Sequence, residues 1–300
     1  MKITFYKPIA VILATVLLTV PTVLGQDGLA LMKVETGARQ AGMGGAAVSL
    51  SGDPASAAYN PANAAILGSF KTTLDYNTYW EDVSLQTGYV SATLSRRLWL
   101  HGGIRFAGID NLEARTSPTI EPEGYFDAHD VSFKAGLTYR LSDKLTAGAA
   151  AGWFVEKIAE YRGSAFNLDV GLNYRATRDL SLGASAVNVG SDLRLGQSGK
   201  EGVDVPIPTS YRFGGSYRYD RFLGAADLVY VDDEAHVHVG AEGMLHESVA
   251  LRAGYMAGYD SKDFTAGATF SHRNFDVNYA FVPFSNDLGT SHLFSLTVSL

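Results

Sequence analysis

Two neighbouring segments, VSFKAGLTYR (131–140) and LTAGAAAGW (145–153), decide the fold class of this 300-residue chain. In both segments, apolar or aromatic side chains alternate with polar or small ones at every second position. Because successive side chains of a β-strand point to opposite faces, this period of two predicts strands with one apolar face. The short connection between them contains Ser142 and Asp143, residues that favour a tight turn. The two segments therefore predict a hairpin of long antiparallel strands.

The same alternation recurs from residue 69 to the end of the chain, where no segment has a sustained apolar period of 3.6 residues. Most of the predicted strands have about ten residues or more, which exceeds the mode of roughly 5–6 in soluble sheets. A tilted strand that crosses a bilayer needs roughly 9–11 residues. The alternation predicts about fourteen strands, near 69–78, 84–95, 98–109, 128–141, 144–156, 162–175, 179–190, 209–219, 221–231, 235–245, 248–258, 263–271, 274–283 and 291–300.

The predicted connections alternate in length along the chain. Every second connection is tight, as at 96–97 and 272–273. The long connections all have the other parity: about 110–127, 191–208 and 284–290. Short turns at one rim and longer loops at the other are typical of outer-membrane barrels. Since backbone groups in hydrocarbon must all be paired, the strands of 69–300 are expected to close into an all-β, membrane-spanning, antiparallel up-and-down barrel.

Residues 26–68 do not alternate, and they contain GARQAGMGGAA (37–47) and DPASAAYNPA (53–62). A barrel of fourteen strands is too wide for its own side chains to fill, so a segment of the chain is expected to occupy the lumen. The sequence therefore predicts an N-terminal hatch, or plug, over 26–68. We expect the backbone of this hatch to approach the barrel wall closely at Gly42, Gly44 and Gly45.

The first 25 residues are expected to be a secretory signal peptide. Lys2 and Lys7 precede an apolar run over 9–20 that is too short to span a bilayer, and small residues precede Gln26. Together with the strand pattern, the signal peptide predicts a location in the outer membrane of a Gram-negative bacterium. The expected partners are outer-membrane lipid and the barrel-assembly machinery.

The composition excludes several classes of protein. The formal net charge is −7, so the chain lacks the basic surface that nucleic acid binding requires. The absence of cysteine excludes disulfide frameworks and thiol catalysis. Charged residues make up 18% and aromatic residues 11% of the chain, a combination that argues against disorder. The mean hydropathy of +0.02 does not indicate a helical membrane bundle.

The run GARQAGMGGAAVSLSGDPASAAYNPANAA (37–65) resembles the N-terminal motif of the PorV/PorQ family of outer-membrane proteins, which is related to the FadL-type fatty-acid transporters. Within it, Asn60, Pro61 and Ala62 resemble the NPA motif of the FadL hatch. The segments at 157–190 and 208–219 are similar to strands of the same family. This resemblance implies a 14-stranded barrel with an N-terminal hatch in its lumen.

The resemblance implies two functions. PorV and PorQ serve the type IX secretion system, so the main hypothesis is a component that handles exported proteins. The alternative is a FadL-like channel for uptake or export of hydrophobic small molecules. A continuous apolar tunnel is expected for transport, and a plugged lumen lined by charges is expected for the role with protein partners.

The alternation predicts roles for two sets of barrel residues. The C-terminal strand carries the expected signal for barrel assembly: Phe294, Leu296, Val298 and Leu300. Charged residues share the polar face of the strands, and we expect them to form ion pairs that brace the wall and tether the hatch. They are Lys134, Arg140, Asp169, Arg175, Arg212, Arg218, Asp227, Arg252 and Asp276.

The polar residues raise the questions of metal binding and of enzyme catalysis. His236, His238 and Glu242 share one face of a predicted strand, where two imidazoles about 7 Å apart could share a metal. A polar lumen wall explains the same pattern and is the favoured interpretation. Because no serine lies in a nucleophile elbow, the sequence predicts neither enzyme activity nor a cofactor.

Overall fold

In the computed structural model, the chain is described over residues 30–79, 83–118, 120–197, 202–286 and 289–300. The predicted signal peptide, residues 1–25, lies outside the described residues. Among the described residues, no helix is long enough and apolar enough to cross a membrane.

Fourteen strands of the described chain form one closed barrel, in which each strand pairs antiparallel with both neighbours. The first and last strands complete the ring, since β1 pairs with β16 from Lys71 opposite Ser299 to Thr78 opposite His292. The prediction of a fourteen-stranded antiparallel barrel is therefore confirmed. The barrel strands are β1 Phe70–Thr78, β2 Ser84–Ser95, β3 Leu98–Ala114, β4 Gly124–Arg140, β5 Leu145–Ile158, β6 Tyr161–Arg175, β7 Leu180–Gly190, β10 Ser210–Tyr219, β11 Phe222–Val231, β12 Glu234–His246, β13 Val249–Ala257, β14 Phe264–His272, β15 Phe275–Pro283 and β16 Thr290–Ser299.

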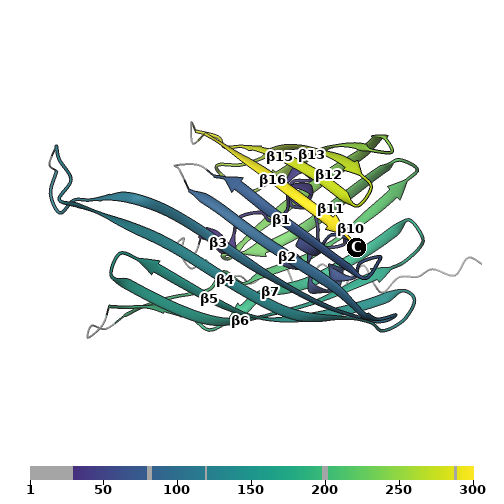
Figure 1. Ribbon diagram of the computed structural model, residues 1–300, viewed down its shortest axis with the longest axis horizontal. Helices are drawn as coiled ribbons and strands as arrows, with labels where there is room; N and C mark the ends of the chain where they lie inside the picture. Colours follow the sequence, from purple (N-terminus) through teal and green to yellow (C-terminus); the bar gives the residue numbers. More distant parts are fainter. Residues whose placement is uncertain (1–29, 80–82, 119, 198–201, 287–288) are drawn as a thin grey trace, which may run out of the picture.

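The wall is taller on one side than on the other. Strands β3 and β4 have 17 residues each, whereas β13, β14 and β15 have nine each. Figure 1 shows β3 to β6 reaching well beyond the other strands at the end of the barrel that carries the longer connections. We call this end the wide end, and the opposite end the short-turn end.

Two expected loops are partly strands. The predicted loop 110–127 is wrong in extent, because β3 continues to Ala114 and β4 begins at Gly124. A bulge between Ile109 and Leu112, where Asn111 has a φ of 60°, keeps the two strands paired beyond the predicted end. The second loop, 191–208, contains a small hairpin of β8 Leu193–Leu195 and β9 Val203–Val205.

Most exposed side chains of the barrel strands are apolar and most inward ones are polar or small, although a few large apolar side chains such as Phe154 and Tyr89 are buried inside. In β16, Phe294 and Leu296 are exposed on the outside, while Ser295 and Thr297 are buried inside. Val298 is half-buried, and Leu300 follows the strand, where its carbonyl accepts hydrogen bonds from the N–H groups of residues 69 and 70. This arrangement places the polar face of the sheet around the lumen.

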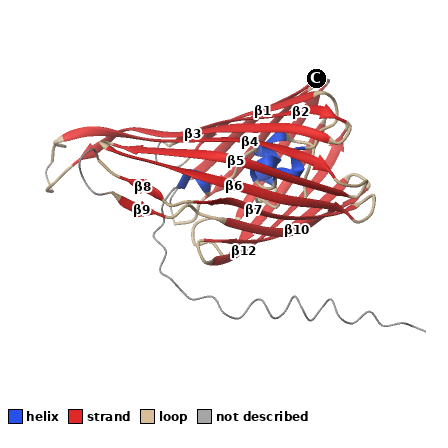
Figure 2. Ribbon diagram, turned by 90° about the horizontal axis from the view of Figure 1, so that it is seen from below, coloured by secondary structure: helices blue, strands red, loops and turns tan. Residues whose placement is uncertain are grey.

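Of the described chain before β1, residues 30–66 lie largely inside the barrel. They form four short helical turns, which are η1 Ala30–Met32, α2 Ala38–Gly42, η2 Pro54–Ala58 and η3 Pro61–Ala64. Figure 2 shows these helices enclosed by the strands. Nearly all side chains from 38 to 50 are buried, which leaves the short-turn end of the lumen filled.

Candidate functional site: a cavity above the lumen hatch

The lumen holds two different parts of the hatch. Residues 38–64, which we call the floor, pack tightly between the strands toward the short-turn end. Residues 31–36, which we call the strap, cross the lumen nearer the wide end and line a cavity. The floor is described first because it determines where the cavity ends.

Asn60 organises the centre of the floor. It caps η3, because its Oδ1 accepts a hydrogen bond from the Ala62 N–H at 2.9 Å, and Pro61 occupies the first position of the turn. Its Nδ2 donates to the Val48 carbonyl at 2.8 Å and to the Leu172 carbonyl of β6 at 2.9 Å. The side chain is fully buried, and each of its polar atoms has a partner. The Asn60 side chain thus joins the hatch backbone at Val48 and the turn η3 to strand β6 of the wall.

Glycines allow the floor and the wall to approach each other. Gly44 has a φ of 63°, and a Cβ there would lie 2.9 Å from the Tyr255 backbone nitrogen. A Cβ on Gly45 would meet the His238 ring, and one on Gly42 would lie 3.1 Å from Gly267 Cα. All three sequence-predicted hatch glycines therefore face a wall strand at short range.

The wall contributes glycines of its own, which sequence reasoning missed. A Cβ on any of five inward glycines would lie less than 3.0 Å from hatch atoms, mostly backbone atoms. These residues are Gly148, Gly171, Gly183, Gly240 and Gly254. Their signal is present in the sequence, since each occupies a lumen-facing position in the alternation of its strand.

Charged wall residues also hold the floor. A single carboxylate oxygen of Asp227 accepts the N–H groups of Ala47 and Val48 at 2.7 and 2.8 Å. Glu242 receives Arg39 of the hatch through two hydrogen bonds and Arg252 of β13 through one, at 2.7–3.1 Å. Glu242 thus forms an ion pair between wall and hatch with Arg39, whereas Asp227 holds the hatch through backbone N–H groups.

The other predicted lumen charges are dispersed. Lys134 pairs with buried Asp169 at 2.6 Å, and Arg140 lies over the Trp99 ring at 4.9 Å. Arg175 and Arg218 are exposed at the short-turn rim, and Asp276 is half-buried on the inner face of β15. Within the described part of the chain, none of the last three belongs to a salt bridge within 4.0 Å.

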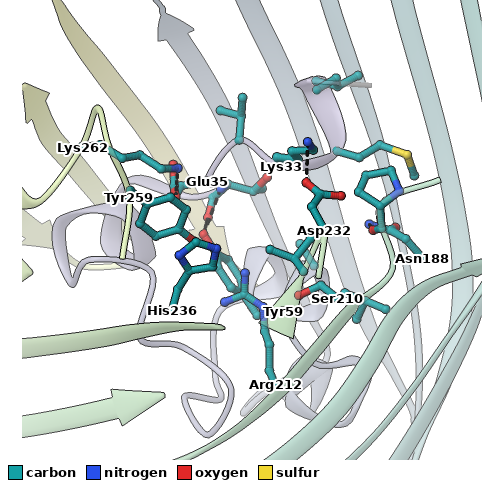
Figure 3. Close-up of a pocket in the computed structure, with 18 of the residues that line it drawn as sticks. Lys33, Glu35, Tyr59, Asn188, Ser210, Arg212, Asp232, His236, Tyr259 and Lys262 are labelled. Atoms are coloured by element: carbon teal, nitrogen blue, oxygen red, sulfur yellow. Dashed lines mark hydrogen bonds and ion pairs between the residues drawn. The ribbon is translucent and has the colours of Figure 1, made fainter. Parts of the chain in front are cut away.

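Between the strap and the wide end lies a cavity of about 1020 Å³. Its lining combines four tyrosines with charged groups, and its rim includes the exposed residues Asp233 and Asp260. Figure 3 shows Tyr59, Arg212, His236 and Tyr259 gathered on one side of this space. The lining tyrosines are Tyr59, Tyr79, Tyr89 and Tyr259.

The strap is held from nearly opposite sides of the barrel. Arg105 of β3 donates through Nη2 to the Val34 carbonyl at 2.8 Å. Lys33 forms an ion pair with Asp232 of the β11–β12 turn, and Glu35 pairs with Lys262 of the β13–β14 connection at 2.7 Å. β3 and β13 lie six positions apart in a ring of fourteen strands, so these contacts span the lumen.

The pKa values of the strap carboxyl and of the nearby tyrosine hydroxyls are shifted in opposite directions. Burial alone would raise the pKa of the Glu35 carboxyl, but the adjacent Lys262 ammonium outweighs it, and the pKa lies below its usual value of 4.5. Burial, reinforced by the Glu35 charge, raises the pKa of the Tyr59 and Tyr259 hydroxyls. Tyr59 therefore stays neutral, and its hydroxyl donates to the Thr36 carbonyl at 2.9 Å.

The three candidate metal ligands, His236, His238 and Glu242, contact other side chains of the protein. The His236 ring stacks on Tyr259 with centroids 3.9 Å apart, and His238 Nε2 lies 2.9 Å from the Tyr259 hydroxyl. Glu242 is occupied by the two arginines described above. Elsewhere, Asp110, Asp127 and His129 bring three ligand-type atoms within 4.8 Å of one another on the hairpin of β3 and β4, away from the cavity.

Several solved structures share the fold of this chain. A monoaromatic hydrocarbon channel, the TodX deltaS2S3 mutant, aligns with a TM-score of 0.67 at 14% identity, over 88% of this chain and 99% of that one. The Ralstonia pickettii toluene transporter TbuX aligns with a TM-score of 0.63 at 14% identity, over 88% and 98% of the two chains. A Pseudomonas aeruginosa FadL homologue aligns with a TM-score of 0.59 at 12% identity, over 88% of this chain and 98% of that one. No protein-family model and no curated protein sequence matches the chain. At these identities the likeness establishes the barrel fold.

Proposed function

We propose that this protein is an outer-membrane channel that passes small organic molecules with an apolar part. The observation that carries the proposal is the cavity of about 1020 Å³ between the strap and the wide end. Its size is at the upper end of the roughly 300–1,000 Å³ of small-molecule sites, and its four tyrosines offer apolar surface with polar edges. The similar structures are described as hydrocarbon channels and toluene transporters, which supports the same function.

The two halves of the lumen bear differently on the channel and on the protein-secretion hypothesis. The floor occupies the short-turn half of the barrel with buried, hydrogen-bonded backbone, so a polypeptide has no passage there. A small molecule needs only limited displacement of the hatch or the wall. The expected contrast between an apolar tunnel and a charged, plugged lumen was too simple, because this lumen is plugged in one half and hollow in the other.

Blocking the cavity tests the channel. The chain has no cysteine, so Ser210→Cys places a single thiol on the cavity lining for a bulky thiol reagent. In bacteria that lack other channels of this type, labelling is expected to abolish the protein-dependent initial uptake of radiolabelled toluene. Ser164→Cys on the outer face of β6 is the matched control. Unchanged uptake after complete labelling of Ser210→Cys would contradict the channel, and retained export substrates in a deletion strain would favour secretion.

A further inference from the structure

The lining of the cavity holds five lysine or arginine side chains and five carboxylates, but these charges are not all paired with one another. Three of its cations have carboxylate partners within 4.0 Å: Lys33 with Asp232, Lys262 with Glu35, and Lys134 with Asp169. Among the described residues, the two remaining lysine or arginine side chains of the lining have none. They are Arg105 and Arg212.

Both guanidinium groups are only partly satisfied by the protein. Arg105 donates through Nη2 to the Val34 carbonyl, and Arg212 donates through Nη1 to the Gly45 carbonyl at 3.3 Å. Each guanidinium has five N–H donors, and Nε of both arginines lacks a partner among the described residues. Nearby Ser210, which is 6% exposed, has an unpartnered hydroxyl as well. Two guanidinium groups that line a hollow space without a carboxylate partner favour an anionic ligand with acceptor oxygens.

Aromatic rings accompany these charges. The Arg212 guanidinium lies 5.0 Å from the centre of the Tyr59 ring, and Tyr79, Tyr89 and Tyr259 line the same space. A flat apolar body can pack on such rings while its charged group reaches an arginine. An extended alkyl chain lacks a comparable surface, because the charged strap interrupts the apolar lining. A neutral hydrocarbon would leave the two guanidinium groups facing apolar matter.

The acidic rim does not cancel this preference. Asp233, Glu234 and Asp260 are exposed at the wide end, where water and salt weaken their field. Arg105 and Arg212 are half-buried beneath them, where the effective dielectric constant is lower and charge interactions are stronger. The inner cations therefore dominate the energy of a bound anion.

From this charge and ring arrangement we propose that the cavity binds a monocyclic aromatic carboxylate, a molecule with one ring and one acidic group. Arg212 of β10 and Arg105 of β3 receive the carboxylate, and the tyrosines receive the ring. The inference rests on the proposed function, since it names the class of molecule that the channel carries.

Binding to the full-length barrel in lipid nanodiscs tests the proposal by calorimetry. The probes are benzoate, benzyl alcohol and benzylammonium, which share a ring and differ in charge. Benzoate is expected to bind at least about tenfold more tightly than benzyl alcohol, and benzylammonium more weakly than both. Equal affinity for benzoate and benzyl alcohol would overturn the proposal without any variant.

Variants locate the site. Arg212→Gln and Arg105→Gln are each expected to lower benzoate affinity about tenfold and to leave benzyl alcohol affinity within twofold. Arg218→Gln, at the exposed short-turn rim, is the matched control and should change neither. Arg212→Lys keeps the charge and should lose less than Arg212→Gln, which separates charge from folding defects. Benzoate affinity unchanged in both glutamine variants would overturn the assignment.

Uptake distinguishes the two proposals from each other. If toluene uptake depends on the protein but benzoate shows no preference in binding, the channel stands and the aromatic acid is wrong. If benzoate binds through Arg212 but neither compound enters the cell through the protein, the binding site stands and the channel is wrong.

Discussion

The floor and the strap belong to one hatch, yet they are held in the lumen by different forces. The floor is fixed by shape and by buried hydrogen bonds, with wall glycines such as Gly183 against its backbone. The strap is fixed mainly by charge, through Arg105, Lys33 and Glu35. Steric fit changes little with salt or pH, whereas ion pairs respond to both. The floor has one ion pair with the wall, between Arg39 and Glu242, but it is held chiefly by steric fit. The comparison indicates that solution conditions release the strap more readily than the floor.

The largest effect is expected when a side chain is introduced at a wall glycine that contacts the floor. Gly183→Val would place side-chain atoms where the Val48 carbonyl now lies, since even a Cβ would come within 3.0 Å of that backbone. We expect the floor to be expelled, because backbone on both sides cannot yield as a side chain can. Single-channel recordings should then show a much larger conductance. Gly224→Val, whose Cβ would meet no atom within 4 Å, should leave conductance unchanged; a closed Gly183→Val channel would contradict steric sealing.

A smaller effect is expected from the buried hydrogen bonds of the floor. Asp227→Asn removes the charge that receives the N–H groups of Ala47 and Val48. Hydrogen bonds to a charged group contribute about 1.5–3 kcal/mol, so exchange of these two amides should accelerate by about tenfold or more. Asp276→Asn, which changes a half-buried carboxylate with no hydrogen bond to the hatch, serves as the control. Equal exchange rates in both variants would show that shape alone holds the floor.

The strap should respond to acid. Because the pKa of Glu35 is lowered in the folded protein, its ion pair with Lys262 contributes fully above about pH 4.5 and is lost as pH falls through the lower, folded pKa. Hydrogen exchange of residues 33–36, corrected for the intrinsic effect of pH, should therefore accelerate as the pH falls below 4.5. In Glu35→Gln, the strap should exchange faster at neutral pH and lose this acid response. An unaltered acid response in that variant would assign it to another group.

The smallest effect is expected at Lys33. Its side chain and that of Asp232 are 25% and 34% exposed, and ion pairs so accessible to water contribute about 0–1 kcal/mol. Lys33→Gln should accelerate strap exchange by at most about fivefold, and 1 M NaCl should remove the difference from the unmodified protein. A larger change that persists in high salt would mean that Lys33 supports the strap by packing.

The barrel could be predicted from the sequence because its signal is local. Every strand carries its own alternation, so segments such as 131–140 reveal their faces without knowledge of their neighbours. Errors arose where a ladder continues without that pattern, as beyond the bulge at Asn111. There the pairing of one strand with the next, rather than the residues of either, extends the sheet.

The cavity could not be predicted for the opposite reason. Its lining depends on contacts between segments far apart in the chain, such as Glu35 with Lys262, which are 227 positions apart. Alternation showed that Arg212 faces inward, but not that it would lack a carboxylate partner. Gly183 was equally visible as an inward glycine, but its partner in the hatch was not. The lack of alternation over 26–68 and the width of the barrel predicted the hatch, whereas the distribution of charge within the lumen required the structure.

The pairing of β1 with β16 has a consequence for the order of assembly. The hatch is made first, yet it hydrogen-bonds to the last strand, where Ser295 Oγ accepts from the Ala38 N–H at 2.7 Å. The ring is closed only when β16 pairs with β1. Because Ala38 and Ser295 are both buried inside the closed ring, we expect the floor to be in place when the seam between β1 and β16 forms.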